Sequence, residues 1–184
     1  MTTKQDQALK HYTGVGSRET PEDVLLLMQK IGMKYAKQGW ILRSGGAVGA
    51  DAAFSHGCLH QDGEQELYIP WNGFNGLFNT TKGVCLVQDQ GVLKRASEIA
   101  AAVHPNWNAC SKGAKDLHTR NVYQVLGADL QTPSRGLICW SPIQGSSIKG
   151  GTRTAWEVAR YSGIPCFNLA YPSVLRRFEL HISK

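Results

Sequence analysis

The chain has 184 residues, which is long enough for one well-buried domain and too short for two ordinary ones. Twenty Lys and Arg against 14 Asp and Glu give a net charge of +6, which would attract nucleotide or nucleic-acid phosphates, although a solvated basic surface without a partner explains it equally well. No apolar run approaches a membrane span, and the polar start lacks a signal-peptide hydrophobic region, so we expect a cytoplasmic protein that does not enter a membrane.

The predicted elements alternate between buried strands and amphipathic helices. Residues 11–15 form a short strand, and a helix follows with Thr20 as its N-cap, Pro21 at its first position and Gly39 after its end. The later elements are a strand at 40–43, a helix to residue 58, a strand at 66–70, helices at 90–103 and 115–130, a strand at 136–140, a helix at 152–162 and a strand at 164–169. Residues 77–89 stay unassigned. This order predicts an α/β fold, one Rossmann-like domain over residues 1–184 with a mainly parallel sheet flanked by helices.

Three glycine-rich turns come directly after predicted strands and before predicted helices. Because ligands of parallel α/β sheets bind at the carboxyl ends of the strands, we expect the three turns to form one site. Glycine lets the backbone approach a ligand, and the first turn of a helix offers unpaired N–H groups to a phosphate. The alternative is that the glycines only make tight turns. The candidate ligand-binding residues in these turns are Gly16, Ser17, Arg18, Ser44, Gly45, Gly46, Asp51, Gly150, Gly151, Thr152 and Thr154.

Two charged residues of these turns have an alternative role as well as a ligand-binding one. Asp51 ends the second turn, where it either hydrogen-bonds a ribose or caps the following helix. Arg18 is placed to pair with a phosphate, and an ordinary surface arginine is the equally good alternative. Trp71 lies on a glycine-rich loop after the third strand, where it stacks a base or packs under its own loop.

Glu157 is the most informative charge in the sequence. It lies five positions after Thr152, within the first turns of the last predicted helix, so it could face the anion site. A carboxylate beside a phosphate suits ribose hydroxyls, a water molecule, or the positive charge that develops at an anomeric carbon during glycosidic cleavage. The alternative is a helix-dipole partner or a salt bridge to a nearby arginine.

Several common signatures are missing from the sequence. There is no third glycine to complete a dinucleotide-binding motif, no phosphate-binding Gly-x-x-x-x-Gly-Lys, no Gly-x-Ser-x-Gly elbow and no His-Glu-x-x-His. The five cysteines are scattered and form no Cys-x-x-Cys pair, so we expect reduced thiols rather than disulfides or a zinc knuckle. We therefore expect no cofactor and no metal.

The spacing Gly150-Gly151-x-x-Thr154-x-x-Glu157 resembles the Pro-Gly-Gly-x-Gly-Thr-x-x-Glu motif of the lonely-guy (LOG) and lysine-decarboxylase-like proteins, which are Rossmann-like nucleoside-5′-monophosphate phosphoribohydrolases. The segment from Asp116 to Asn121 resembles that family's Met-His-x-Arg-Lys. The resemblance implies that Arg120 and Glu157 are catalytic and that Asn121 binds the ligand. The Gly-Ser-Arg and Ser-Gly-Gly-Ala segments resemble the wider SLOG superfamily, with its DprA-like and YspA-like members, in order from about residue 11 to 170.

Three departures from the LOG motif concern catalytic activity and leave the expected class of ligand, a nucleotide, unchanged. Lys149 replaces its proline, Arg153 replaces a glycine, and Asn121 replaces the lysine after the catalytic arginine. The leading hypothesis is a nucleotide or nucleotide-derived ligand, with hydrolysis of its N-glycosidic bond if the chain is an enzyme. A non-catalytic nucleotide sensor or carrier and a DprA-like single-strand DNA binder are the alternatives, with nucleic acid ranked below a small molecule. The resemblance also allows a homo-oligomer, because family members commonly build sites near a dimer interface.

Overall fold

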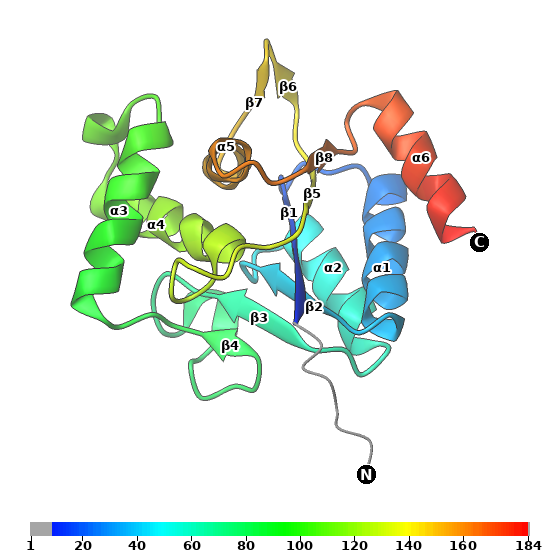
Figure 1. Ribbon diagram of the computed structural model, residues 1–184, viewed down its shortest axis with the longest axis horizontal. Helices are drawn as coiled ribbons and strands as arrows, with labels where there is room; N and C mark the ends of the chain where they lie inside the picture. Colours follow the sequence, from blue (N-terminus) through cyan, green and yellow to red (C-terminus); the bar gives the residue numbers. More distant parts are fainter. Residues whose placement is uncertain (1–8, 184) are drawn as a thin grey trace.

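The structure is a computed structural model that describes residues 9–183, and Figure 1 shows helices and strands alternating along the chain. Six parallel strands form one sheet of order β4-β3-β2-β1-β5-β8, so the prediction of an α/β Rossmann-like fold is confirmed. The elements are β1 Lys10–Gly16, α1 Glu22–Lys37, β2 Trp40–Ser44, α2 Ala50–Leu59, β3 Gln65–Tyr68, η1 Phe74–Gly76, β4 Val84–Cys85, α3 Gln90–Val103, η2 Trp107–Ala109, α4 Lys112–Leu126, β5 Leu137–Trp140, β6 Ile143–Gln144, β7 Ser147–Ile148, α5 Thr152–Tyr161, β8 Cys166–Asn168 and α6 Pro172–Ile182.

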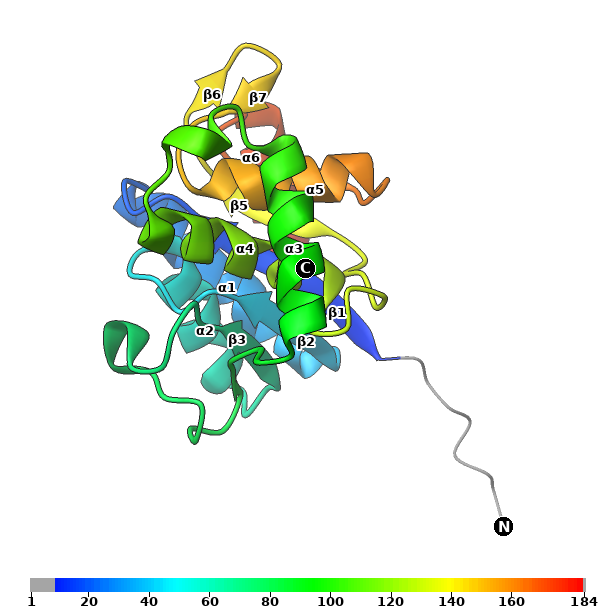
Figure 2. The same cartoon turned by 90° about the vertical axis from the view of Figure 1, so that its left-hand side faces the viewer.

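Helices cover both faces of the sheet, as the two views in Figures 1 and 2 show. Helices α1, α2 and α6 pack on one face, where Met28, Phe54 and Phe178 are buried in a common cluster. Helices α3, α4 and α5 pack on the other face around Val122 and Ala155. Both faces of the central strands are therefore buried, which explains the continuous apolar run of β5 in the sequence and the burial of residues 11–15 in β1.

The order of the strands places a switch point between β1 and β5. From β1 the chain moves outward through β2 and β3 to β4, and it then returns to the other side of β1 to form β5 and β8. All six strands run in the same direction, so their carboxyl ends share one edge of the sheet. The turns into α1, α2, α5 and α6 all start at this edge, which we call the carboxyl edge.

Helices α1 and α2 approach each other closely through two glycines. A Cβ atom on Gly57 would lie 1.9 Å from the backbone oxygen of Gln29, and one on Gly32 would lie 2.5 Å from the backbone oxygen of Phe54. Real Cβ atoms do not come so close to backbone. The two glycines therefore set the separation of these helices and, through it, the position of the β2–α2 turn.

Some element boundaries differ from those predicted. Pro21, rather than Thr20, is the N-cap of α1, because the Thr20 hydroxyl donates to the Ser17 carbonyl and so serves the preceding turn. Helix α4 covers 112–126 instead of 115–130, and it ends where Gly127 adopts a positive φ of 80°. The short strand β4, the β6–β7 hairpin and helix α6 had no counterpart among the predicted elements.

The state of the cysteines and the character of the helices can be compared with what the sequence led us to expect. All five cysteines are free thiols, with Cys58 and Cys139 buried and the other three partly buried. Within residues 9–183, none of the helices has the length and apolar character that crossing a membrane would require.

Candidate functional site

The β1 turn is held by main-chain contacts and leaves one basic side chain exposed. Gly16 is packed so closely that a Cβ atom would lie 2.6 Å from the Cβ atom of Ala50, at the start of α2. The Ser17 amide donates to the Trp140 carbonyl at 2.9 Å, and its hydroxyl accepts from the Glu19 amide at 3.1 Å. Arg18 is exposed and makes no salt bridge within the described chain.

The polar side chains of the β2 turn form hydrogen bonds with the backbone. The Ser44 hydroxyl is fully buried and donates to the Gly14 carbonyl at 2.6 Å. One oxygen of Asp51 accepts from the amides of Gly45 and Ala47 at 3.1 and 3.4 Å. Burial raises the pKa of Asp51 to about 6, although Arg120 and the turn amides lower it. Asp51 thus closes the turn from the first turn of α2 but does not cap that helix, and its role in binding a ribose stays a prediction.

Arg120 braces this turn from the opposite face of the sheet. Its guanidinium is buried, donates to the Gly45 carbonyl at 2.5 Å and to the Tyr68 carbonyl at 3.3 Å, and lies 5.5 Å from the Phe74 ring centroid. A Cβ atom on Gly45 would fall 1.5 Å from a guanidinium nitrogen, so only glycine leaves room for it. Burial lowers the pKa of Arg120, while the Asp51 carboxylate raises it. The two opposite charges therefore stabilise each other's ionised form at the β2 turn.

Asn121, the next residue along α4, reaches the third turn. Its side-chain amide donates to the Gly151 carbonyl at 2.8 Å. Gln124 lies one helical turn further on, and in the amide orientation that satisfies its neighbours it accepts from the Gly45 amide and donates to Asn121. Arg120, Asn121 and Gln124 thus connect the β2 turn with the start of α5. Gln124 was not among the predicted site residues, although its spacing from Arg120 puts both on one face of a helix.

The start of α5 is the most open part of the carboxyl edge. Gly150 and Gly151 are exposed, and a Cβ atom on either would meet no other atom within 4 Å. Thr152 is buried as the first residue of the helix, and the Thr154 hydroxyl lies 2.8 Å from Nδ1 of His118. Burial, together with nearby His104 and Arg120, lowers the pKa of His118 to about 4.

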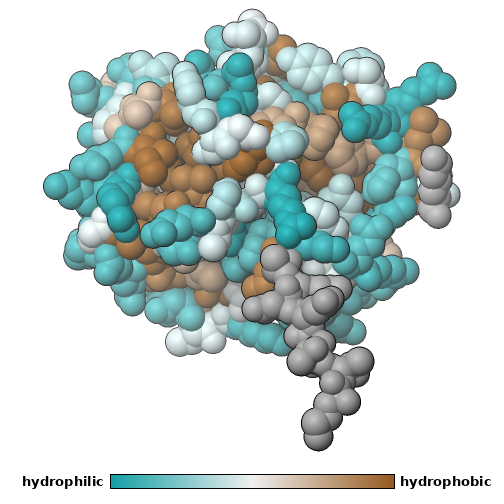
Figure 3. All heavy atoms as spheres, viewed as in Figure 1, coloured by the Kyte–Doolittle hydropathy of each residue, from teal (hydrophilic) through white to brown (hydrophobic). Residues whose placement is uncertain are grey.

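A cavity of about 270 Å³ opens beside this start of α5. It is lined by residues of the α3–α4 connection, of the β6–β7 hairpin and of the glycine turn: His104, Pro105, His118, Gln144, Gly150, Gly151 and Arg153. A second and larger cavity, of about 700 Å³, lies between α1 and α6 on a different side of the molecule. Figure 3 shows brown apolar side chains on that side, and Arg176 and Arg177 line the cavity there.

Glu157 points to the β6–β7 hairpin. The Ser147 hydroxyl donates to one carboxylate oxygen, and Arg160 lies 3.4 Å from the other. The carboxylate is buried, and within residues 9–183 no hydrogen bond or ion pair joins it to Arg120. The two residues that the resemblance assigns to catalysis are therefore engaged with different partners, and their catalytic roles stay predictions.

Trp71 lies beside the β2 turn. The residue is 43% exposed, and its ring packs edge-on against Phe74 at 5.4 Å between centroids. The Asn75 side chain donates to the Gly46 carbonyl at 3.2 Å and ties this loop to the turn. The structure thus places Trp71 on a loop that contacts Gly46 through Asn75 and Arg120 through Phe74, with part of the tryptophan open to solvent.

The helices differ in whether a side chain caps their N-terminal amides. None of α1, α2, α5 and α6 has a side-chain hydrogen bond to its N-terminal amides, whereas Asp89 caps α3 and Ser111 caps α4. Uncapped first-turn amides are donors available to water or to a bound anion. Acidic residues occupy the first turns of α1 and α2, but none occupies that of α5. The α5 start is therefore the best anion site of the three glycine turns.

Comparison with known proteins gives a match over the first part of the chain. The sequence model of the family described as DNA recombination-mediator protein A matches residues 3–70. No curated protein sequence matches the chain. Two solved structures are similar at low identity: DNA processing protein A (DprA) from Streptococcus pneumoniae, with 17% identity, a TM-score of 0.49 and coverage of 87% of this chain and 50% of that one, and DprA from Helicobacter pylori, with 15% identity, a TM-score of 0.40 and coverage of 95% and 80%.

The chain spans half the length of the S. pneumoniae protein. The H. pylori structure is described as showing that protein's mode of binding single-stranded DNA. The segment matched by the family model runs from before β1 to the end of β3, and it includes the glycine turns after β1 and β2. Over residues 3–70 the sequence is therefore similar to the DNA recombination-mediator protein A family, a member of the SLOG superfamily of Rossmann-like proteins.

Proposed function

We propose that the chain acts as one Rossmann-like domain that binds single-stranded DNA along the carboxyl edge of its sheet and does not cleave it. The observation that carries the proposal is the start of α5, where Gly150 and Gly151 are exposed, no side chain caps the helix and no acid lies in its first turn. Such a helix start accepts a phosphate through its N–H groups and its dipole. The family match over residues 3–70 favours DNA over a free nucleotide.

Basic side chains flank this helix start on both sides. Lys149 is exposed directly before the glycines, and Arg153 lies in the first turn of α5, where its Nε atom is buried without a hydrogen-bond partner. Arg18 is exposed at the neighbouring β1 turn. A DNA strand carries phosphates at regular intervals, so several separated cations suit a strand better than a single phosphate group.

Trp71 supplies the stacking surface that single-strand binding requires. Its exposed ring lies beside the β2 turn, and the adjoining residues Arg120 and Asn121 connect that turn with Gly151. A base stacked on Trp71 and a phosphate on the α5 start would thus occupy neighbouring parts of the same edge. Stacking on an aromatic side chain contributes about 1–3 kcal/mol per base and tolerates any base.

The first test is fluorescence anisotropy with a labelled oligothymidylate at several salt concentrations. The double charge reversal Lys149→Glu with Arg153→Glu is expected to weaken binding at least about tenfold and to reduce the salt slope by about 0.7 for each phosphate that the variant no longer neutralises. Trp71→Ala is expected to weaken binding by about 1–3 kcal/mol without changing the salt slope. A duplex of the same sequence should bind more weakly than the single strand.

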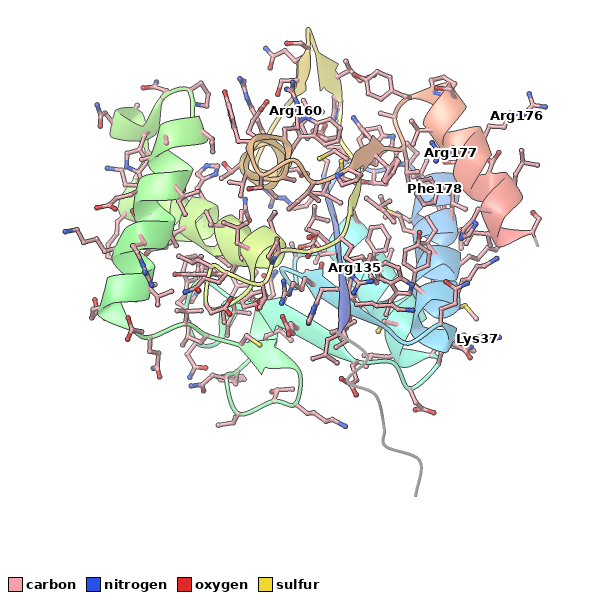
Figure 4. The ribbon with its side chains drawn as sticks, in the orientation of Figure 1. Lys37, Arg135, Arg160, Arg176, Arg177 and Phe178 are labelled. Atoms are coloured by element: carbon pink, nitrogen blue, oxygen red, sulfur yellow. The ribbon has the colours of Figure 1, made fainter. Side chains whose placement is uncertain are left out.

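The matched control is Lys37→Glu with Arg176→Glu, which changes the net charge by the same amount. Figure 4 shows these residues on α1 and α6 at the right of the view, away from α5. Lys37 ends α1 and therefore lies at the amino edge of the sheet. If this control weakened binding as much as the α5 variant, the DNA would be held by overall charge or by the α6 side, and the proposal would be wrong.

Hydrolysis of a nucleoside 5′-monophosphate is the competing function. It would need the Glu157 carboxylate to face a ribose, but both of its oxygens already have partners in Ser147 and Arg160. The discriminating experiment incubates wild type and Glu157→Gln with nucleoside monophosphates, NAD and ADP-ribose, followed by chromatography. Release of free base by wild type alone would support hydrolysis against the proposal, whereas intact nucleotides are the expected result.

A further inference from the structure

Two side chains of the α3–α4 connection and one of α4 form a cluster that the DNA-binding proposal does not use. His104 directly follows α3, Cys110 directly follows η2, and His118 lies in the second turn of α4. Their nearest ligand atoms all lie within 4.8 Å of one another. Both ring nitrogens of His104 are 3.8 Å from the Cys110 sulfur, and the two imidazole centroids are 4.3 Å apart.

These separations suit a tetrahedral metal site. With Zn–N of about 2.0 Å and Zn–S of about 2.3 Å, two ligand atoms of a tetrahedral zinc lie about 3.5 Å apart. Side-chain rotations that move these atoms by about an ångström would therefore bring all three onto one ion. One thiolate and two imidazoles are a donor set that zinc accepts, and hard cations such as Mg²⁺ do not prefer it.

The surroundings of His118 also resemble those of a metal ligand. Its Nδ1 atom lies 2.8 Å from the Thr154 hydroxyl, which fixes the ring and leaves Nε2 for the cluster. Metal-binding histidines usually have such a partner on their second nitrogen. The Trp107 ring closes one side of the cluster, with centroids 6.1 and 6.5 Å from those of His104 and His118.

The fourth coordination position would open into the cavity at the start of α5. His104 and His118 line that cavity of about 270 Å³ together with Gly150, Gly151 and Arg153. A zinc ion with three protein ligands keeps one position for water or an exchangeable anion. The cationic Arg153 beside this position favours an anion there.

We propose that His104, Cys110 and His118 bind one zinc ion, with a fourth position that is open to the cavity beside Gly151. The spacing His104-x5-Cys110-x7-His118 carries no familiar metal motif, because the ligands come from a helix end, a short turn and the next helix. The site goes beyond DNA binding and requires no DNA for its test.

The test is titration of the purified chain with Co²⁺, a spectroscopic substitute for zinc, in the absence of DNA. The expected result is one Co²⁺ per chain, with visible bands of tetrahedral cobalt and an ultraviolet thiolate-to-cobalt charge-transfer band, both abolished by added Zn²⁺. Cys110→Ser should remove the charge-transfer band, and His104→Gln should weaken Co²⁺ binding at least about tenfold. Thr154→Val should keep the band and weaken binding about 10- to 100-fold.

Matched controls use the same substitutions elsewhere. Cys85→Ser, at another partly buried cysteine, and His60→Gln, at an exposed histidine, should leave the spectrum and the affinity unchanged. The proposal would be overturned if wild type gave no thiolate band, or if the band survived Cys110→Ser. Loss of the band in Cys85→Ser would equally overturn it, because the thiolate would then come from β4. Circular dichroism of each variant separates loss of metal from loss of fold.

Discussion

Arg120→Met is expected to lower the free energy of unfolding by about 3–5 kcal/mol at pH 8. Methionine fills a similar volume but cannot donate hydrogen bonds, so the carbonyls of Gly45 and Tyr68 lose the guanidinium that they now accept from. The Asp51 carboxylate, which is buried beside it, is left as an uncompensated charge. Within the described chain, Arg120 and Asp51 form no direct salt bridge, but each buried charge favours the ionised form of the other. Removing one of two opposite buried charges is more costly than replacing both.

The effect of Arg120→Met should depend on pH in a defined direction. The pKa of Asp51 in the folded protein is about 6, above its ordinary value near 3.8, so the native state binds more protons than the unfolded chain between these values. The contribution of Asp51 to the free energy of unfolding therefore falls as the pH rises through that range. Because Arg120 lowers the Asp51 pKa, removing it raises that pKa and extends the range upward. At pH 5 the loss should be smaller than at pH 8 by at least about 1.4 kcal/mol.

Urea denaturation at pH 5 and pH 8 measures both quantities. The control is Arg95→Met on the exposed side of α3, which should change stability by less than about 0.5 kcal/mol at either pH. Adding Asp51→Asn to Arg120→Met should recover part of the loss at pH 8, because the unpaired charge is then gone. An equal loss at both pH values would show that the Arg120–Asp51 pair does not control the turn.

Gly57→Ala is expected to destabilise the protein by about 3 kcal/mol, near the upper end for an added methyl group in a packed interface. The new Cβ atom would lie 1.9 Å from the Gln29 backbone oxygen, and a backbone atom of a helix cannot rotate away as a side chain can. Helices α1 and α2 must therefore separate, which also moves the β2 turn at the start of α2. Thermal or urea unfolding of the variant gives the loss directly.

Gly113→Ala is the matched control for this substitution. Gly113 also lies in a helix, in the first turn of α4, but a Cβ atom there would meet no other atom within 4 Å. Alanine has the better helix propensity, so stability should rise by about 0.5 kcal/mol. If the two variants changed stability by the same amount and in the same direction, the close contact of α1 and α2 would not be the cause.

Much of the fold could be predicted because its signals are local. The helix at 90–103 matches α3 at both ends, and the strands at 11–15 and 40–43 match β1 and β2 within one residue. Helix α6 was missed although Pro172 begins it and Phe178 is buried, because the last strand had already completed the predicted alternation. The hairpin at 143–148 has strands of only two residues, which is too short for a periodic pattern.

The site could be predicted only in part, because its decisive contacts join residues far apart in the sequence. The glycine turns indicated the carboxyl edge, and the structure connects two of them through Arg120 and Asn121. The partner of Glu157 could not be foreseen, because Ser147 lies on a hairpin that the sequence pattern did not reveal. Likewise, nothing in the spacing of His104, Cys110 and His118 indicates that the α3–α4 connection brings them together.

The most direct test of DNA binding at the carboxyl edge is a titration of the 15N-labelled chain with oligothymidylate, followed by amide resonances. The prediction is that the largest shifts fall on Gly150, Gly151 and Thr152, with further shifts in the β1 and β2 turns and at the Trp71 side chain. Shifts confined to α1 and α6, around the cavity lined by Arg176 and Arg177, would contradict it and place the DNA on the opposite side of the molecule.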